Sequence, residues 1–104
     1  MEILINTDHN IEGTAQMRAY FQEQIETQFE RFREHLSRIE VKISDENGDK
    51  KSENDKRCVL EARIKGMQPI AVTSFGNTVE KAFNTAADKL KTSLDSTIGK
   101  LRSY

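Results

Sequence analysis

The spacing of apolar residues changes twice along this chain, and this change constrains the fold more than any other feature. Between residues 14 and 36 apolar side chains recur every three or four positions, which predicts an amphipathic helix of about 22 residues. Thr14 is its predicted N-cap, because a hydroxyl oxygen can accept a hydrogen bond from an unpaired backbone N–H. The predicted buried face consists of Met17, Tyr20, Phe21, Ile25, Phe29, Phe32 and Leu36.

From residue 39 to residue 75 the apolar period is close to two, which predicts β-strands. A further strand is expected over residues 2–7, and a turn over residues 66–69 separates the last two strands. Because the last three strands follow one another closely, we expect them to pair antiparallel. The two alternating apolar sets are Ile39, Val41 and Ile43, and then Cys58, Leu60, Ala62 and Ile64; residues 70–75 form the last predicted strand. Residues 45–56 contain no apolar side chain and are expected to form an exposed connection.

The helical period returns after residue 76 and continues almost to the end of the chain. Asn77 and Glu80 are spaced as a capping box, which predicts a helix start at this point. Gly99 should weaken the last turns of this helix. Its predicted buried stripe consists of Val79, Phe83, Ala86, Leu90, Leu94, Ile98 and Leu101.

The predicted element order is therefore β-α-β-β-β-α in a single domain covering residues 1–104. A sheet with one apolar face must cover that face, and two amphipathic helices can supply the cover. The expected fold class is α+β: a two-layer sandwich of one four-stranded sheet with both helices packed on one face.

Composition narrows the function classes. No apolar run reaches the roughly 18 residues of a membrane span, and the N-terminus lacks the basic start of a signal peptide. The single cysteine agrees with a reducing compartment, so a cytoplasmic location is expected. The formal net charge of −1 argues against a strongly basic nucleic-acid binder. Basic residues still outnumber acidic ones, 12 to 9, in residues 41–104.

No pattern predicts catalysis or a bound metal. Cys58 lies on the apolar side of its strand, where a cysteine is usually a small core residue. The acidic segment fails as a calcium loop, because an EF-hand needs Gly at about position six and Glu at about position twelve. Counted from Asp45, Gly48 comes too early, and Lys56 stands in place of the Glu. We therefore expect no enzyme activity, no catalytic residue, no metal, no cofactor and no small-molecule substrate.

Three segments of the sequence form a recognisable combination. They are Ile5-Asn6-Thr7 before the Thr14 helix start; Asp45-Glu46-Asn47-Gly48 with Asp55-Lys56-Arg57-Cys58; and Val79-Glu80-Lys81-Ala82-Phe83 leading to Asp88-Lys89-Leu90. Together they resemble the ribosome-associated inhibitor and hibernation promoting factor family, also called the sigma-modulation or light-repressed protein family, in its short form. The resemblance extends from Ile3 to about Leu94.

The resemblance implies a function. Members of the family bind the small ribosomal subunit near the decoding region, where they occupy space that mRNA and tRNA would use. They silence or protect idle ribosomes under stress, without a cofactor and without catalysis. The implied partner of this chain is the small subunit through its rRNA phosphates; neither a membrane nor DNA is expected.

Two groups of cations are candidates for rRNA binding. At about 100° per residue, the basic side chains of the last helix lie within about 100° of Lys81, on one exposed face that also carries Asp88 and Asp95. This group is Lys81, Lys89, Lys91, Lys100 and Arg102. The second group, Lys42, Arg57, Arg63 and Lys65, should project from the polar side of the sheet. Because we expect no aromatic residue there, we predict phosphate or sugar contacts rather than base stacking.

Other interpretations stay open. Either cationic group can be an ordinary solvated surface. Thr92, Asp95 and Ser96 make the last helix less basic than the family pattern, so a protein-binding regulatory adaptor with weakened RNA binding is the alternative function. A double-stranded RNA binder shares the order of helices and strands, but the near-neutral charge argues against it.

Overall fold

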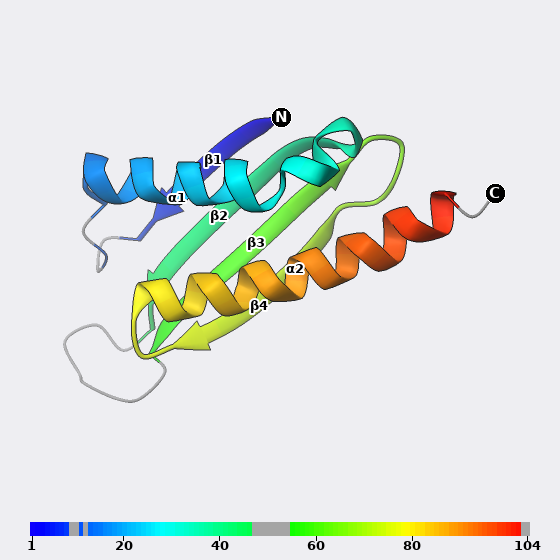
Figure 1. Cartoon of the computed structure of the whole chain (residues 1–104). Coiled ribbons are helices and arrows are strands. Elements are labelled where there is room, and N and C mark those ends of the chain that lie inside the picture. The colour runs from blue at the N-terminus through cyan, green and yellow to red at the C-terminus, as the bar shows by residue number, and fades with distance from the viewer. Residues whose placement is uncertain (9–10, 12, 47–54, 103–104) are drawn as a thin grey trace.

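The structure, a computed structural model, describes residues 1–8, 11, 13–46 and 55–102, and the side chains of these residues up to Gly99. The predicted element order is confirmed (Figure 1). The elements are β1 (Glu2–Thr7), α1 (Ala15–Gln28), a 3-10 helix η1 (Glu30–His35), β2 (Leu36–Asp45), β3 (Lys56–Ile64), β4 (Ile70–Gly76) and α2 (Val79–Arg102).

The four strands form one sheet in the order β1-β2-β3-β4. β1 runs parallel to β2, whereas β2 with β3 and β3 with β4 pair antiparallel, as expected for closely spaced strands. Both helices cover the same face of this sheet (Figure 1). The α+β two-layer architecture predicted from the sequence is therefore confirmed, and the described residues form no covering layer on the other face of the sheet.

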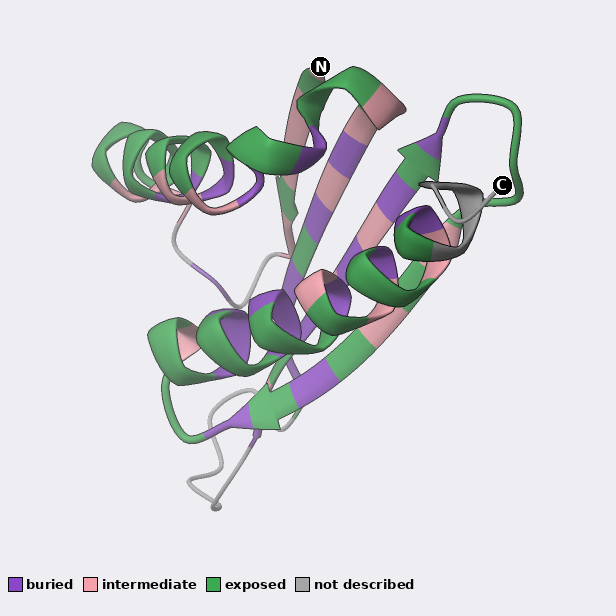
Figure 2. Ribbon diagram, turned by 45° about the vertical axis from the view of Figure 1, so that its right-hand side comes forward, coloured by how far each residue is buried: buried purple, intermediate pink, exposed green. Residues whose placement is uncertain are grey.

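The core lies between the sheet and the two helices (Figure 2). On β2, Ile39, Val41 and Ile43 are buried, while Lys42 between them is exposed on the opposite face. The rings of Phe21 on α1 and Phe83 on α2 lie 4.7 Å apart between centroids, so they join the two helices. Most of the predicted apolar residues are buried, but Tyr20 is an exception and lies exposed on α1.

The first helix is shorter than predicted. It ends at Gln28, and Phe29 (φ −109°) leads into η1 instead of continuing the α-helix. In a 3-10 helix, side chains three residues apart eclipse each other. The tighter turn therefore directs both Phe29 and Phe32 into the core, where both are buried, before Leu36 begins β2.

The two helix starts differ in how well they were predicted. The Thr14 hydroxyl accepts a hydrogen bond from the Met17 backbone N–H at 3.0 Å, so its predicted capping role is confirmed. For α2 the predicted cap is wrong by one residue. The Thr78 hydroxyl, not the Asn77 side chain, accepts a bond of 3.1 Å from the Lys81 N–H.

A cationic side chain from a helix meets each outer strand of the sheet. Arg18 of α1 donates to the Ile5 carbonyl of β1 at 2.6 Å, and Lys89 of α2 donates to the Thr73 carbonyl of β4 at 3.0 Å. Edge strands present unpaired backbone groups to which another strand can add. These contacts occupy one acceptor on each edge and tie the helices to the sheet.

The connection between β2 and β3 was predicted to be exposed from residue 45 to residue 56, and this is wrong at both ends. Asp45 and Asp55 are buried at the base of the β2–β3 hairpin. Lys56 lies within β3, and its ammonium is 2.9 Å from Asp55 and 3.3 Å from Asp45. The hydrogen bond to Asp55, with the charge of both carboxylates, raises the pKa of Lys56 above its usual 10.5. Residues 47–54, including Asn47 and Asp49 of the rejected calcium loop, lie outside the described residues.

Gly76, between β4 and α2, is expected to tolerate no side chain. A Cβ there would lie 2.7 Å from the Ala82 backbone nitrogen, which cannot move without shifting α2. We expect Gly76→Ala to lower the free energy of unfolding by about 1–3 kcal/mol, as overpacking does. Gly99→Ala is the matched control, because a Cβ there meets nothing within 4 Å. It should raise helix stability by up to about 1 kcal/mol. Urea denaturation measures the free energy of unfolding of both variants. Equal changes in the two variants would contradict the steric argument.

Candidate functional site

The uncovered face of the sheet carries most of the second predicted cationic group. Lys42, Arg57 and Arg63 are exposed on this face, as predicted, and Lys65 is exposed just beyond the end of β3. Strand register divides them between two ends. Lys42 pairs with Val59, two pairs away from the Ser44–Arg57 pair, whereas Arg63 pairs with Arg38 near the opposite end. The four cations therefore do not form one continuous patch.

The expectation that this face lacks an aromatic residue is wrong. Phe75 of β4 is 52% exposed and lies directly opposite Arg57 in the register of β3 and β4. Within β4, Val72 and Ser74 are the more buried residues, while Thr73 and Phe75 point to the other side. A strict two-residue alternation counted from Val72 would have predicted this orientation. Treating residues 70–75 as one apolar run concealed it.

Two separate hollows lie at this end of the molecule. One, of about 490 Å³, is lined in part by Asp8, Lys42 and Arg57. The second, of about 390 Å³, is lined by Phe75 itself together with Lys81, Asn84 and neighbouring residues of the β4–α2 junction. Lys81 was predicted as part of the helix group, but the structure places it beside the sheet aromatic. We call Lys42, Arg57, Phe75 and Lys81 the Phe75 end of the sheet.

The cations differ in whether their own chain already engages them. Within the described part of the molecule, the side-chain ammonium groups of Lys42, Lys65 and Lys81 take part in no hydrogen bond or ion pair. Arg57 is 3.4 Å from Glu46, and Arg63 is 3.7 Å from Glu61. Exposed pairs of this kind contribute little and exchange readily with other ligands. At the Phe75 end, Lys42 and Lys81 are therefore available, and Arg57 can become available.

In the first predicted group, on α2, the described side chains of Lys89 and Lys91 are engaged by the chain itself. Lys89 and Lys91 are two residues apart, so their side chains leave the helix about 160° apart. Lys89 donates to the Thr73 carbonyl of β4, and Lys91 lies 3.4 Å from Asp88. Asp95, between these positions and the helix end, binds Arg31 at 2.8 Å. Lys100 and Arg102 lie outside the residues whose side chains are described.

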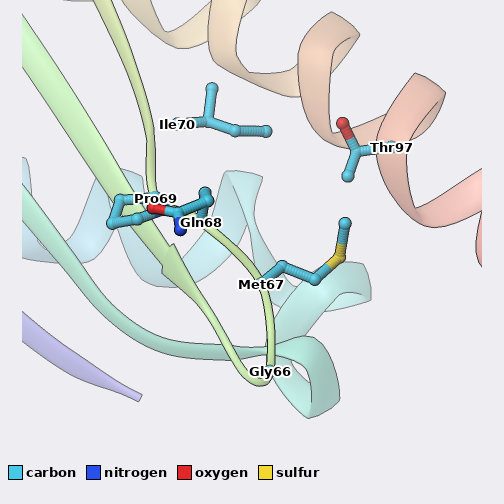
Figure 3. Close-up of a pocket in the computed structure, with 6 residues that line it drawn as sticks. All are labelled: Gly66, Met67, Gln68, Pro69, Ile70 and Thr97. Atoms are coloured by element: carbon cyan, nitrogen blue, oxygen red, sulfur yellow. The ribbon is translucent and has the colours of Figure 1, made fainter.

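A third hollow lies at the opposite end of the molecule, between the β3–β4 turn and α2 (Figure 3). Figure 3 shows Met67 extending toward Thr97, with Pro69 and Ile70 beside it. None of the six described residues that line it carries a charge, so it offers no cation to a phosphate. Gly66 makes the turn with a positive φ of 75°.

Cys58 is buried in β3 and is expected to be chemically inert. Burial raises the pKa of its thiol from 9.0 to about 12, so the reactive thiolate is scarce at neutral pH. At pH 8 we expect a thiol-specific chromogenic reagent to modify Cys58 only slowly in the native protein and completely in guanidinium. Fast modification without denaturant would contradict this burial. The Cys58→Ser variant supplies the background signal.

The described side chains assemble no site for a metal, since no group of three His, Cys, Asp or Glu residues among them could hold one. In the same part of the chain no helix is long and apolar enough to cross a membrane. The arrangement found here offers cations and one aromatic ring on an open surface, which suits binding of an anionic polymer better than chemistry on a small molecule.

Comparisons with known proteins bear on the family and on the fold of the chain. Residues 4–102 match the family model described as Sigma 54 modulation protein / S30EA ribosomal protein. A comparison with curated protein sequences finds no match. Among solved structures, the Protein Y N-terminal domain of Thermus thermophilus is similar, with a TM-score of 0.74 and 18% identity over 93% of this chain and 99% of that one. A ribosomal subunit interface protein from Coxiella burnetii gives a TM-score of 0.71 and 18% identity over 95% and 99% of the two chains.

Proposed function

The chain belongs to the Sigma 54 modulation protein / S30EA ribosomal protein family, a family of ribosome-associated binding factors and not of enzymes, and on this premise we propose that it binds the small ribosomal subunit near the decoding region. There it blocks translation sterically during stress, when ribosomes are idle. The resemblance noted in the sequence is confirmed at the level of the family.

The family match over residues 4–102 is the observation that carries this proposal, because it includes all the helices and nearly all of the sheet. The solved structures share the fold at 18% identity, and one of them is titled a ribosomal subunit interface protein. A partner on the ribosome implies a cytoplasmic location. It also implies that rRNA, rather than DNA, a membrane or a small molecule, is the ligand.

Binding would be chiefly electrostatic. A cation that neutralises an rRNA phosphate releases condensed counterions, which supplies affinity without reading bases. Lys42, Arg57 and Lys81 are the strongest candidates, because they cluster and are unengaged or only weakly paired. Arg63 and Lys65 form a second, separate group. Lys89 and Lys91 would first have to leave their present partners, and Lys100 and Arg102 stay in the proposal on sequence alone.

Sedimentation with ribosomes tests the proposal. Purified protein and ribosomes are run on sucrose gradients at about 50 mM and about 500 mM monovalent salt, with magnesium held constant, because phosphate contacts weaken steeply with salt. We expect comigration with the small subunit and the intact ribosome at low salt and its loss at high salt. Chemical probing of the rRNA should then show protection near the decoding region. Absence of comigration at low salt would reject the proposal.

One observation favours a second candidate, the protein-binding adaptor. The described acids and cations of α2 largely satisfy one another or the rest of the chain, through Lys91–Asp88, Arg31–Asp95 and Lys89 on β4. A helix with its charges already paired gains less from phosphate binding. Retention of a protein partner at about 500 mM salt, together with no ribosome binding at about 50 mM, would favour the adaptor.

A further inference from the structure

We infer that the Phe75 end of the sheet is a stacking site for one unpaired base of a single-stranded RNA segment, with the flanking phosphates held by Lys42, Arg57 and Lys81. This inference rests on the proposed function and deepens it. A surface that binds only phosphates could accept paired or unpaired RNA, whereas a stacking site requires the RNA at the contact to be unpaired. The bases of a duplex are stacked on one another and cannot offer a free face to an aromatic ring.

The exposure of Phe75 is the first argument. The other four phenylalanines of the chain, Phe21, Phe29, Phe32 and Phe83, are buried in the core. Phe75 alone among them is on the uncovered face, 52% exposed, and it is the most exposed large apolar side chain in the described part of the molecule. It therefore adds little to the core. An aromatic ring on an open β-sheet surface is the feature on which unpaired bases stack in single-strand binding proteins.

The placement of the cations is the second argument. Arg57 lies directly opposite Phe75 on β3, and residues paired in this way have Cβ atoms about 5 Å apart. Lys81 lines the same hollow as Phe75 from the α2 side, while Arg57 lies on the β3 side of Phe75 and lines a separate hollow with Lys42. Cations thus lie on both sides of the ring. A strand whose base covers Phe75 can place a phosphate against each side.

Apart from Glu46, which is 3.4 Å from Arg57, two acids of the same face limit how far the RNA can extend. Glu40 and Glu61 pair directly across β2 and β3, in the row next to Lys42 and Val59 but farther from Phe75. Neither acid is near Phe75 in the register, and Glu40 accepts a hydrogen bond from Asn6 at 2.7 Å. Two carboxylates side by side repel a phosphate backbone. The strand should therefore cross the sheet at the Phe75 end rather than run along the whole face.

A protein strand is a poorer occupant of this surface than RNA. β4 is an edge strand of the sheet, and an edge strand can accept an added strand from a partner protein. However, Lys89 already occupies the Thr73 carbonyl, two residues before Phe75, so a partner strand would have to displace it. The exposed ring also lies among cations rather than among other apolar side chains, which suits a nucleotide better than a protein core.

The test compares Phe75→Ala with Tyr20→Ala and Phe75→Trp in the full chain. Tyr20 is the matched control, because it is an exposed aromatic residue (39%) on α1, away from the uncovered face. Each protein is titrated against a fluorescent single-stranded RNA of about ten nucleotides, against a duplex of the same length, and against small subunits. Phe75→Ala removes the ring on which one base would stack. It should therefore weaken binding to single-stranded RNA and to small subunits roughly 5- to 100-fold. Phe75→Trp and Tyr20→Ala should bind like the unmodified chain.

Ultraviolet crosslinking adds a readout that a purely structural role of Phe75 would not move. Trypsin cleaves after Lys65 and Lys81, so a nucleotide attached to Phe75 should be found on the peptide covering residues 66–81. Phe75→Ala should abolish that adduct while leaving the protein folded.

The outcomes separate this inference from the proposed function. Salt-sensitive binding to subunits that Phe75→Ala leaves unchanged, without an adduct on residues 66–81, would overturn the stacking site and leave the proposed function intact. Phe75-dependent binding of single-stranded RNA without any binding to subunits would support the stacking site and reject the ribosomal partner. Equal affinity for duplex, or capture of a protein that persists at high salt, would overturn the inference.

Discussion

The double substitution Lys42→Glu and Lys81→Glu is expected to lower the affinity for small subunits on the order of 10- to 100-fold at about 50 mM salt. Both ammonium groups lie at the Phe75 end and are unengaged within the described part of the chain, so their loss breaks no internal contact. The slope of log affinity against log salt should fall by roughly two, because about two phosphate contacts are lost. Fluorescence anisotropy of labelled protein against purified subunits measures both quantities.

The matched control is the double substitution of Arg63 and Lys65 with Glu. It makes the same change in net charge at the opposite end of the same face. If binding is localised, this variant should lose much less affinity than the Lys42/Lys81 variant. Equal losses in the two variants would show that overall charge, rather than the Phe75 end, governs binding.

Phe83→Ala is expected to lower the free energy of unfolding by about 3–5 kcal/mol, as large-to-small substitutions of buried phenylalanines do. The Phe83 side chain is fully buried on α2, and its ring contacts that of Phe21 at 4.7 Å. The substitution therefore removes apolar contacts and also the ring pair that joins the two helices. A loss of this size is a large part of the roughly 5–15 kcal/mol available to a small domain. Urea denaturation followed by circular dichroism measures it.

Phe75→Ala is the natural control for Phe83→Ala, since it removes the same side chain from the uncovered face. We expect a change within about 0.5 kcal/mol, as for most surface substitutions. A comparable destabilisation by the two variants would contradict the assignment of Phe75 to a surface outside the core. It would also weaken the argument that its exposure serves binding.

Local patterns in the sequence were sufficient for the fold class. The spacing of apolar residues in the sequence indicates the type of element, because a helix presents every third or fourth residue to a core and a half-buried strand presents every second one. The type of element and its buried side can therefore be predicted from residues such as Ile39, Val41, Leu90 and Leu94. The element that packs against them need not be known. The Thr14 cap is equally local, because its hydroxyl bonds a backbone group only three residues away. The sequence motifs also identified the family.

The candidate site depended on contacts that local patterns do not contain. Helix period placed Lys89 and Lys91 on one broad face, but only the position of α2 over the sheet brought Lys89 to the β4 edge. The register of β3 and β4 set Phe75 opposite Arg57, and the β4–α2 junction brought Lys81 beside it.

The ends of helices and strands also depended on tertiary contacts rather than on local sequence patterns. α1 gives way to η1 because the core must receive both Phe29 and Phe32, which is a demand of the packed sheet rather than of helix propensity. Asp45 and Asp55 look like loop residues in the sequence, yet hairpin pairing buries both against Lys56. Local sequence patterns thus identify the residues that face the core and the family to which the chain belongs. Which cations lie beside the exposed ring depends on strand register and helix placement, because these bring together residues that are distant in the chain.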